Sequence, residues 1–326
     1  MAAMLVWACA LPMAAHAGDR IRIMVGGIEK QIYLPAVLAQ ALGYFKEQGL
    51  DVELLTEPSG VNAEDELLSG SVQGVVGFYD HTIDLQAKGK LVQSVVQFGQ
   101  SPGEAELLAP RLAPEVRSPA EFKGRTLGVT GLGSSTQYLS LYLAMASGLK
   151  PADVKLRAVG SGATFAAALK AGQIDAGMTT EPTISALLQA GEAVMLVDLR
   201  TPVAAEPLLG GVYPAACLYM GSLWINTHRP QVQMLVNALV KSLRFIGDHS
   251  ADEIAGHLPM AYFVGQRPLY VAALAHSKTM FTRDGRMPPT GPANVLRVLQ
   301  RVNKVVARKT IDLSKTYSDD FVAAAR

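Results

Sequence analysis

The chain has 326 residues, which corresponds to about two domains at roughly 150 residues per domain. Hydrophobic residues make up 49% of the chain and charged residues 17%, so there is enough apolar surface for a sizeable core, and an intrinsically disordered chain is excluded. Lysine and arginine number 29 against 28 aspartates and glutamates, and because a net charge of +1 gives no field to attract a polyanion, nucleic acid is not expected as a partner.

Residues 1–17 form an apolar stretch without an acidic or basic side chain and end in Ala15-His16-Ala17. This ending is typical of a secretory signal peptide cleaved after Ala17, although no Lys or Arg precedes the apolar run. A buried N-terminal helix is the alternative interpretation. Lipid anchoring at Cys9 is not expected, because Trp7 fits a lipidation motif poorly. After Ala17 no apolar run approaches the roughly 20 residues needed to cross a bilayer, so a periplasmic protein is expected.

Signatures of catalysis and of metal binding are mostly missing from the sequence. There is no His-Glu-x-x-His motif, no Gly-x-Ser-x-Gly elbow and no phosphate loop, and the 6 histidines are scattered without metal-ligand spacing. Once a signal peptide is removed, Cys217 is the single cysteine, which excludes a disulfide within the chain. Cys217 is expected to be a small buried hydrophobic residue. Neither a metal nor a cofactor is predicted.

The first part of the mature chain alternates short β-rich runs with amphipathic segments. Strands are predicted at 21–25, 52–55, 72–78 and 91–98, and helices at 33–45, 61–69 and 81–88. Such βαβαβαβ alternation favours a parallel, doubly wound sheet with right-handed crossovers.

The alternation then starts again after a capping box, Ser118-Pro119-Ala120-Glu121. Strands are predicted at 126–130, 154–159, 174–178 and 194–197, with helices at 135–147, 163–171 and 182–190. Two such sets indicate two similar lobes. Beyond 210 the pattern is helical, at 232–246, from 250, at 268–281 and at 292–308. The last helix aligns Arg297, Arg301, Lys304 and Arg308 on one face, which we expect to be solvated rather than docked on a partner.

The segment that joins strand 126–130 to the next helix is Gly131-Leu132-Gly133-Ser134-Ser135-Thr136. Thr136 stands where a dinucleotide-binding fingerprint has its third glycine, so a Rossmann site is not favoured. Free backbone N–H groups and hydroxyls at the positive end of a helix form a place where anions bind. The alternative is an ordinary serine N-cap without a ligand.

Further candidates lie where strands end, because ligands of open parallel sheets bind outside the carboxyl ends of the strands. Tyr33 and Phe78 are equally compatible with the core, and Glu181 is equally compatible with a helix-capping role before Pro182. If Glu181 faces the ligand, its carboxylate repels nitrate or sulfate and favours an ammonium group or an aminopyrimidine N–H. The candidate ligand-binding residues are Gly27, Gln31, Tyr33, Phe78, Tyr79, Asp80, Gln97, Gly133, Ser134, Ser135, Thr136, Glu181 and Tyr213.

Four segments, at 41–53, 122–129, 172–176 and 181–182, resemble the periplasmic substrate-binding proteins of ABC importers for nitrate, sulfonates and taurine, together with relatives that bind the thiamine pyrimidine precursor. The resemblance implies a type II binding-protein fold, in which two doubly wound α/β lobes are joined by two crossing strands around a ligand cleft. It implies a first lobe at 18–112 and 210–326, a second lobe at 113–209, and a cleft that contains residues 133–136. The chain departs from the family pattern at Gln73, where an Asp is usual.

The function implied by the resemblance is that of an extracytoplasmic, monomeric component of an ABC transporter. It would capture a small organic solute, such as a sulfonate, a carboxylate or a pyrimidine-like compound, and deliver it to a membrane permease and its ATPase subunit. Pyrimidine-synthesising eukaryotic relatives share the fold and catalyse, but they carry a cysteine-rich motif that a chain with one mature cysteine lacks. An enzyme of the same fold acting on a small anionic substrate, and a ligand sensor for a signalling partner, are the alternatives.

Overall fold

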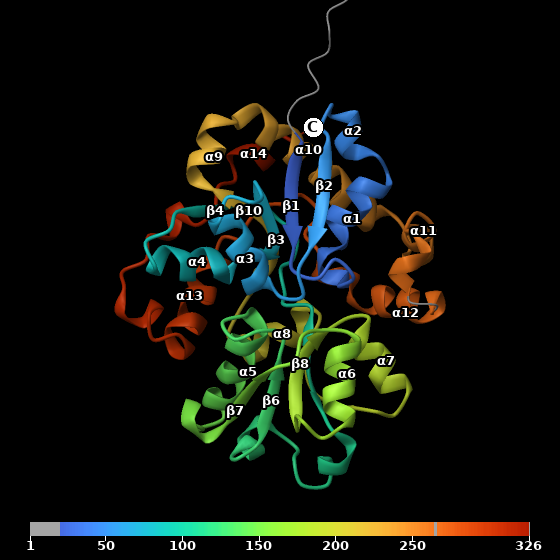
Figure 1. Cartoon of the computed structure of the whole chain (residues 1–326), viewed down its shortest axis with the longest axis vertical. Coiled ribbons are helices and arrows are strands. Elements are labelled where there is room, and N and C mark those ends of the chain that lie inside the picture. The colour runs from blue at the N-terminus through green and yellow to red at the C-terminus, as the bar shows by residue number, and fades with distance from the viewer. Residues whose placement is uncertain (1–19, 264–265, 326) are drawn as a thin grey trace, which may run out of the picture.

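The computed structural model describes residues 20–263 and 266–325, and its strands form two five-stranded sheets (Figure 1). The strand order is β2-β1-β3-β10-β4 in one sheet and β7-β6-β8-β5-β9 in the other. Each sheet and the helices packed on it form one lobe, and the two lobes are stacked along the long axis of the molecule (Figure 1). We call the lobe with β1 lobe 1 and the lobe with β6 lobe 2.

The strands of lobe 1 are β1 (Ile21–Val25), β2 (Val52–Thr56), β3 (Gly74–Phe78), β4 (Val92–Gln97) and β10 (Ala216–Gly221). Its helices are α1 (Leu34–Ala41), α2 (Tyr44–Glu47), α3 (Gly60–Leu68), α4 (Asp80–Ala87), α9 (Ser222–Thr227), α10 (Arg229–Asp248), α11 (Ala251–Gly256), α12 (Arg267–Ser277), α13 (Gly291–Val302) and α14 (Asp320–Ala323). Lobe 2 contains β5 (Glu104–Leu108), β6 (Thr126–Val129), α5 (Ser135–Ala146), β7 (Lys155–Ala158), α6 (Ala163–Lys170), β8 (Ala176–Thr180), α7 (Thr183–Gln189), β9 (Val194–Leu199) and α8 (Pro202–Leu209).

One strand in each sheet runs against its neighbours, and each follows a passage of the chain between the lobes. β10 pairs antiparallel with β3 and β4, so lobe 1 is completed only when the chain returns from lobe 2. β5 pairs antiparallel with β8 and β9. Because β5 lies in the second sheet, the chain enters lobe 2 before Glu104, whereas the sequence placed residues up to 112 in lobe 1. Residue patterns alone predicted neither β5 nor β10.

Two of the predicted helices have different bounds in the structure, one of them because of a glycine, and α8, α9 and α14 were not predicted. The helix expected at 33–45 is broken into α1 and α2 at Gly43, which has a φ of 77°, a left-handed conformation that costs glycine little. The helix expected at 292–308 ends at Val302. The capping box at Ser118 is present as predicted, but it starts a short 3₁₀ turn, Pro119–Phe122.

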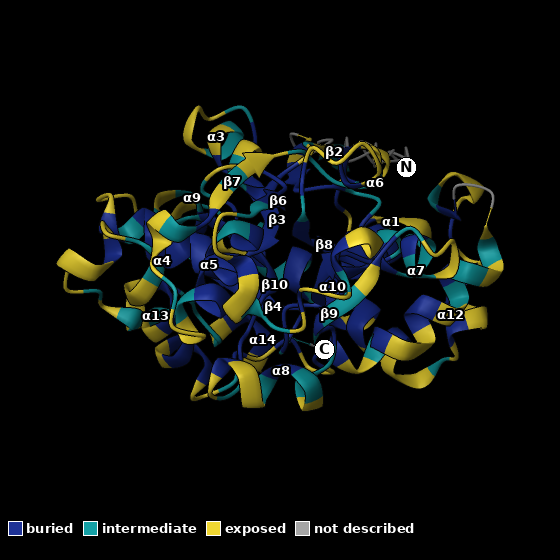
Figure 2. Ribbon diagram, turned by 90° about the horizontal axis from the view of Figure 1, so that it is seen from below, coloured by how far each residue is buried: buried dark blue, intermediate teal, exposed yellow. Residues whose placement is uncertain are grey.

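Buried residues gather around the strands and α5 in the centre of the molecule, and exposed residues cover the outer helix faces (Figure 2). The largest apolar core spans both lobes, because Tyr138 and Tyr142 of α5 pack into the same cluster as the strands of lobe 1. Cys217 is fully buried in β10, as expected, and burial raises the pKa of its thiol to about 12. Between residues 20 and 325, setting aside 264 and 265, no helix is both long and apolar enough to cross a membrane. The signal peptide predicted at 1–17 lies outside the described residues.

Candidate functional site

A small pocket lies between the lobes, where the carboxyl ends of β1 and β3 face the start of α5. It has a volume of about 10 Å³, close to the space that a single water molecule occupies. The lobes are therefore closed over it. We call it the inner pocket, and its lining residues are Lys30, Ile32, Tyr33, Gly60, Phe78, Glu104, Thr130, Ser134, Ser135 and Thr136.

The lobe 2 wall of the inner pocket is the loop that leads into α5. The Ser134 hydroxyl donates to the carbonyl of Gly131 at 2.6 Å and lies 2.6 Å from the Thr136 hydroxyl. Thr136 Oγ1 in turn accepts from the backbone N–H of Thr130 at 3.0 Å. These two hydroxyls fix the shape of the loop, which leaves Ser135 as the side chain that reaches across to lobe 1.

Ser135 meets Asp80, the first residue of α4, across the inner pocket. Its hydroxyl donates to Asp80 Oδ1 at 2.8 Å. The other carboxylate oxygen, Oδ2, is buried and has no hydrogen-bond partner among the described residues. Burial raises the pKa of Asp80, and the nearby charge of His81 and the hydrogen bond from Ser135 oppose this rise. Asp80 therefore has one oxygen available for a further hydrogen-bond donor.

A second carboxyl group, that of Glu104 at the start of β5, lines the same pocket. Its Oε2 is buried and unpartnered within the described part of the chain, and so is the hydroxyl of Tyr213. Burial raises the pKa of Glu104 well above its ordinary value, and Asp80 adds to the rise. After burial itself, the charges of Asp80 and Glu104 raise the pKa of Tyr213, and a hydrogen-bond interaction with Asp80 adds to the rise, so the Tyr213 hydroxyl faces the Asp80 carboxyl group.

Lys30 is the one lysine in the wall of the inner pocket, and it is turned away from the carboxylates. Its Nζ donates to the carbonyl of Gly26 at 2.5 Å and to that of Pro58 at 3.2 Å. Burial lowers the pKa of Lys30, although the charges of Glu29 and Glu104 oppose the shift.

Behind Asp80, His81 forms a buried pair with Glu64 of α3. His81 Nδ1 lies 2.7 Å from Glu64 Oε2, and both side chains are at most 3% exposed. Burial opposes the imidazolium charge, but the hydrogen bond and charge of Glu64 outweigh burial and raise the pKa of His81 to about 9. A cation next to Asp80 offsets part of the cost of burying that carboxylate. The sequence analysis singled out neither His81 nor Glu64, nor Lys30 or Glu104.

The carboxylate of Glu181, expected to face a ligand, is already engaged within lobe 2. Its Oε1 accepts from Arg200 Nη1 at 2.8 Å and from the Ser185 hydroxyl at 2.8 Å, and its Oε2 accepts from the Ser185 N–H at 3.0 Å. Arg200 also binds Asp198. The backbone carbonyl of Glu181, rather than its side chain, meets lobe 1, through the N–H of Gln31 at 3.1 Å.

The remaining candidate residues divide into two groups. Tyr33, Phe78, Ser134, Ser135 and Thr136 line the inner pocket, and Asp80 lies next to it, bonded to the Ser135 hydroxyl. Other side chains turn to structural partners: the Tyr79 hydroxyl contacts Thr316, Gln31 Nε2 donates to the carbonyl of Tyr270, and Gln97 Nε2 donates to those of Gly99 and Ala216. Gly27 and Gly133 have φ angles of 108° and 90°, which explains glycine at both turns.

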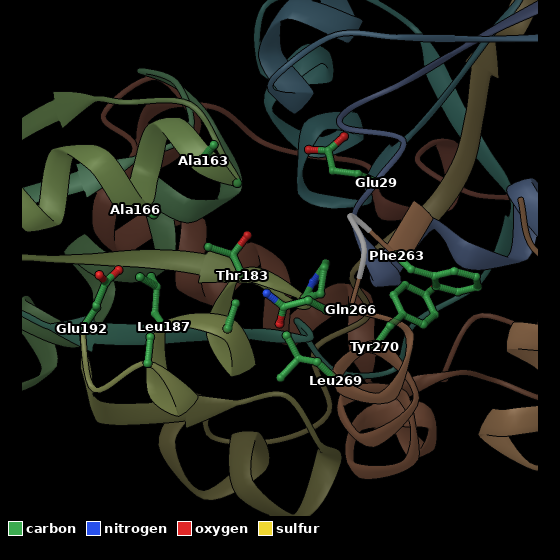
Figure 3. A pocket seen from close by; sticks show the side chains of 14 residues that line it. Glu29, Ala163, Ala166, Thr183, Leu187, Glu192, Phe263, Gln266, Leu269 and Tyr270 are labelled. Carbon is green, nitrogen blue, oxygen red and sulfur yellow. The ribbon is translucent and has the colours of Figure 1, made fainter. Parts of the chain in front are cut away.

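A wider cavity of about 360 Å³ opens beside the inner pocket, between α6 and α7 of lobe 2 and α12 of lobe 1 (Figure 3). Its walls are largely apolar and include Ala186, Leu187 and Leu269. Its two carboxylates have partners, because Glu29 accepts from the Ser161 hydroxyl at 3.0 Å and Glu192 binds Lys170 at 2.6 Å. This cavity offers volume, whereas the inner pocket offers unpartnered polar groups.

Comparison with known proteins places this arrangement in a family. Residues 32–251, which are 220 of the 326, match the family model described as NMT1/THI5 like. The chain belongs to the NMT1/THI5-like family. A solved structure of a protein from Bordetella bronchiseptica RB50 is 34% identical, with a TM-score of 0.89 over 94% of this chain and 97% of that chain. The family resemblance predicted from the sequence is confirmed.

Two more distant solved structures share the fold. The alkanesulfonate-binding protein SsuA from Xanthomonas axonopodis pv. citri aligns with a TM-score of 0.70 at 20% identity, over 94% of this chain and 96% of that chain. The periplasmic nitrate-binding protein NrtA from Synechocystis PCC 6803 aligns with a TM-score of 0.72 at 13% identity, over 94% and 87%. The predicted type II periplasmic-binding-protein fold is therefore confirmed.

Enzymes are also among the relatives of this chain. The 4-amino-5-hydroxymethyl-2-methylpyrimidine phosphate synthase THI13 of Saccharomyces cerevisiae is 32% identical over 166 residues. The match spans 50% of this chain and 46% of the yeast protein, which is less than half its length. The family thus has both binding proteins of this fold and synthases as relatives.

Proposed function

We propose that this protein is the extracytoplasmic solute-binding component of an ABC importer. It captures a small organic solute between its two lobes and presents the closed form to a membrane permease and its ATPase subunit. The observation that carries the proposal is the inner pocket, because both lobes contribute to it and because buried polar atoms of Asp80, Glu104 and Tyr213 have no partner in the described chain.

Unpartnered buried polar atoms indicate what a ligand supplies. Each buried acceptor without a donor costs about 1–3 kcal/mol, and a solute that donates to it recovers this cost. Asp80 Oδ2 and Glu104 Oε2 are both such acceptors. An organic solute with an ammonium, amidine or amino N–H group therefore fits better than a bare inorganic anion. Glu181 is not needed for this preference, since its carboxylate is bound to Arg200.

Solute capture requires the lobes to open, because a pocket of about 10 Å³ admits no organic molecule. The chain passes between the lobes at 98–103 and at 210–215, so rotation about these two connections opens the cleft. A solute shifts the equilibrium toward closure only by binding the closed form more tightly. Contacts to Asp80 from one lobe and to the start of α5 from the other provide that difference.

The second candidate function is an enzyme, which the match to the yeast synthases favours. The geometry supports it less. The Ser135 hydroxyl in the inner pocket donates to an aspartate rather than to a histidine, and Cys217 is buried with a raised pKa, so neither group is activated as a nucleophile.

A thermal-shift screen of the mature chain, starting at Gly18, tests the proposal. We expect a rise in melting temperature that grows as RT ln(1 + [L]/Kd) for solutes with amine or aminopyrimidine groups, with the solute recovered unchanged by mass spectrometry. Conversion of the stabilising solute would instead identify an enzyme. If amines, aminopyrimidines, amino acids, sulfonates, carboxylates and nitrate all leave the melting temperature unchanged, the proposed function is wrong.

A further inference from the structure

The start of α5 carries partial positive charge, as any helix N-terminus does, and the sequence analysis expected an external anion there. In the structure a carboxyl side chain of the protein already occupies the position. Asp80 of lobe 1 contacts lobe 2 here, because its Oδ1 accepts from the Ser135 hydroxyl at 2.8 Å. α5 has 12 residues, so its N-terminal field is that of a full helix.

We propose that Asp80 is a built-in counter-anion for the start of α5 and determines the specificity of the cleft. It makes the cleft reject sulfonates, sulfate and nitrate and accept solutes with a cationic or N–H donor group. This inference rests on the proposed function, because it names the ligand class of the same cleft.

The charges around the inner pocket support this assignment. Asp80 is 0% exposed and Ser135 5%, so water screens their interaction weakly. Glu104 adds a second carboxyl group with an unpartnered oxygen. Lys30, which lines the inner pocket, donates to backbone carbonyls, and within the described residues no ion pair of 4 Å or less joins it to Asp80 or Glu104. His81 lies behind Asp80 and is itself paired with Glu64.

These groups disfavour the binding of an anionic solute. The hydroxyl that would bind it is already donating to Asp80, and a second negative charge a few ångströms from that carboxylate is repelled in a buried setting. The same groups favour the binding of a cationic solute. Placed near Asp80 Oδ2 and Glu104 Oε2, it supplies the donors that both oxygens lack. The fold shared with sulfonate- and nitrate-binding proteins thus does not carry their ligand preference.

The test measures binding of ethanesulfonate and of inorganic sulfate to the mature wild-type chain and to Asp80→Asn by titration calorimetry. The Asn side chain has the same shape and can still accept from Ser135, but it carries no charge. We expect no saturable binding to the wild type, and a gain in sulfonate affinity of at least about tenfold in Asp80→Asn. Asp80→Asn combined with Glu104→Gln removes both carboxylates and is expected to bind sulfonate at least as well.

Glu106→Gln is the matched control. Glu106 is also fully buried, but its partner Ser140 does not line the inner pocket, whereas Ser135, the partner of Asp80, does, so substitution of Glu106 is expected to leave sulfonate binding absent. Sulfonate binding by the wild type, or no gain in either folded Asp80 variant, would overturn the inference. In that case an amine that still stabilises the wild type leaves the proposed function standing. If no solute of any class binds the wild type, the proposed function itself has failed.

Discussion

Polar contacts join the lobes near both ends of the single helix α5, and Tyr138 between them contacts Asp84 and Asn303. The two end contacts differ in how completely their polar groups are paired. At the outer contact, α13 of lobe 1 lies on the second half of α5: Arg297 Nη1 donates to the Tyr142 hydroxyl at 2.9 Å, and Arg301 Nη2 donates to the carbonyl of Met145 at 2.7 Å. At the inner contact Ser135 meets Asp80, and one oxygen of Asp80 stays unpartnered among the residues the structure describes. Under the proposed function, the solute supplies the donor that the inner contact lacks.

The position of the outer contact agrees with this division. Arg297 also hydrogen-bonds to the carbonyl of Leu209, where α8 ends and the chain returns toward lobe 1. The outer contact therefore lies next to 210–215, one of the two connections about which we propose that the lobes rotate, and we expect it to change least on opening. The inner contact lies at the cleft, where closure brings the two lobes together around a solute.

The largest expected effect tests whether buried charges around the cleft depend on their partners. In Arg200→Met the Glu181 carboxylate, 1% exposed, loses its cation, and breaking such a buried pair costs about 3–5 kcal/mol in the free energy of unfolding. Urea denaturation measures the loss. Arg111→Met is the control, because Arg111 is 46% exposed in its pair with Asp175 and a pair of this kind contributes about 1 kcal/mol or less. Equal losses in both variants would contradict the account.

The next effect concerns pH. Burial raises the pKa of Glu106 to about 8, against the hydrogen bond from Ser140, so the folded state holds a proton that the unfolded state releases near 4.5, the ordinary value of a glutamate. The stabilisation is complete below 4.5 and is lost as the pH rises to about 8. We expect wild type to lose on the order of 3 kcal/mol more than Glu106→Gln across this range in urea titrations. The raised pKa of His81 also lowers stability as the pH rises, but it does so equally in the wild type and in Glu106→Gln. If the free energies of unfolding of the two proteins show the same dependence on pH, a buried, protonated Glu106 is excluded.

Arg297→Met addresses the outer contact with a smaller effect. It removes the hydrogen bonds to Tyr142 and Leu209, and we expect a loss of about 1–3 kcal/mol in the free energy of unfolding, because the donor is charged. Solute selectivity is expected to stay unchanged, since the inner pocket is untouched. Arg308→Met, at an exposed position beyond the end of α13, is the control. A change in the ranking of amines and sulfonates in Arg297→Met would show that the two contacts are not separate.

Tyr142→Phe sharpens the comparison with the smallest effect. It removes one hydroxyl from the outer contact and keeps the ring on which Arg297 and Arg301 lie, at 5.7 and 5.9 Å from its centre. We expect a loss of about 0.5–1.5 kcal/mol in thermal or urea unfolding, the usual contribution of one hydrogen bond. If Tyr142→Phe loses as much stability as Arg297→Met, the hydrogen bond between Arg297 and the Tyr142 hydroxyl accounts for the whole outer contact, and the other bonds of Arg297 contribute nothing.

The sequence predicted those parts of the site that depend on local pattern. The start of α5 was predicted because a strand, a glycine turn and three hydroxyl residues follow one another within about ten positions. The order of Phe78, Tyr79 and Asp80 was visible, but not which of them faces the cleft: the first turn of α4 points Asp80 toward Ser135 and lets Tyr79 reach Thr316 inside lobe 1.

Other parts depend on partners far away in the chain. Arg297 and Arg301 are exposed, as expected for a solvated face, but Arg297 and Tyr142 are 155 positions apart, so the sequence could not show that both arginines also hydrogen-bond to α5. Lys30 and Glu104 were missed because a charged residue in a sequence indicates solvent unless its burial is known. Glu104 also begins β5, a strand that the residue pattern did not predict.

The most direct test of the account is a crystal structure of the mature chain with the amine or aminopyrimidine that stabilises it most. The account predicts the solute between the lobes, with a donor group within hydrogen-bond distance of Asp80 or Glu104 and with contacts to residues 134–136 of lobe 2. A solute bound only in the apolar cavity between α7 and α12, or on the surface of a single lobe, would contradict it.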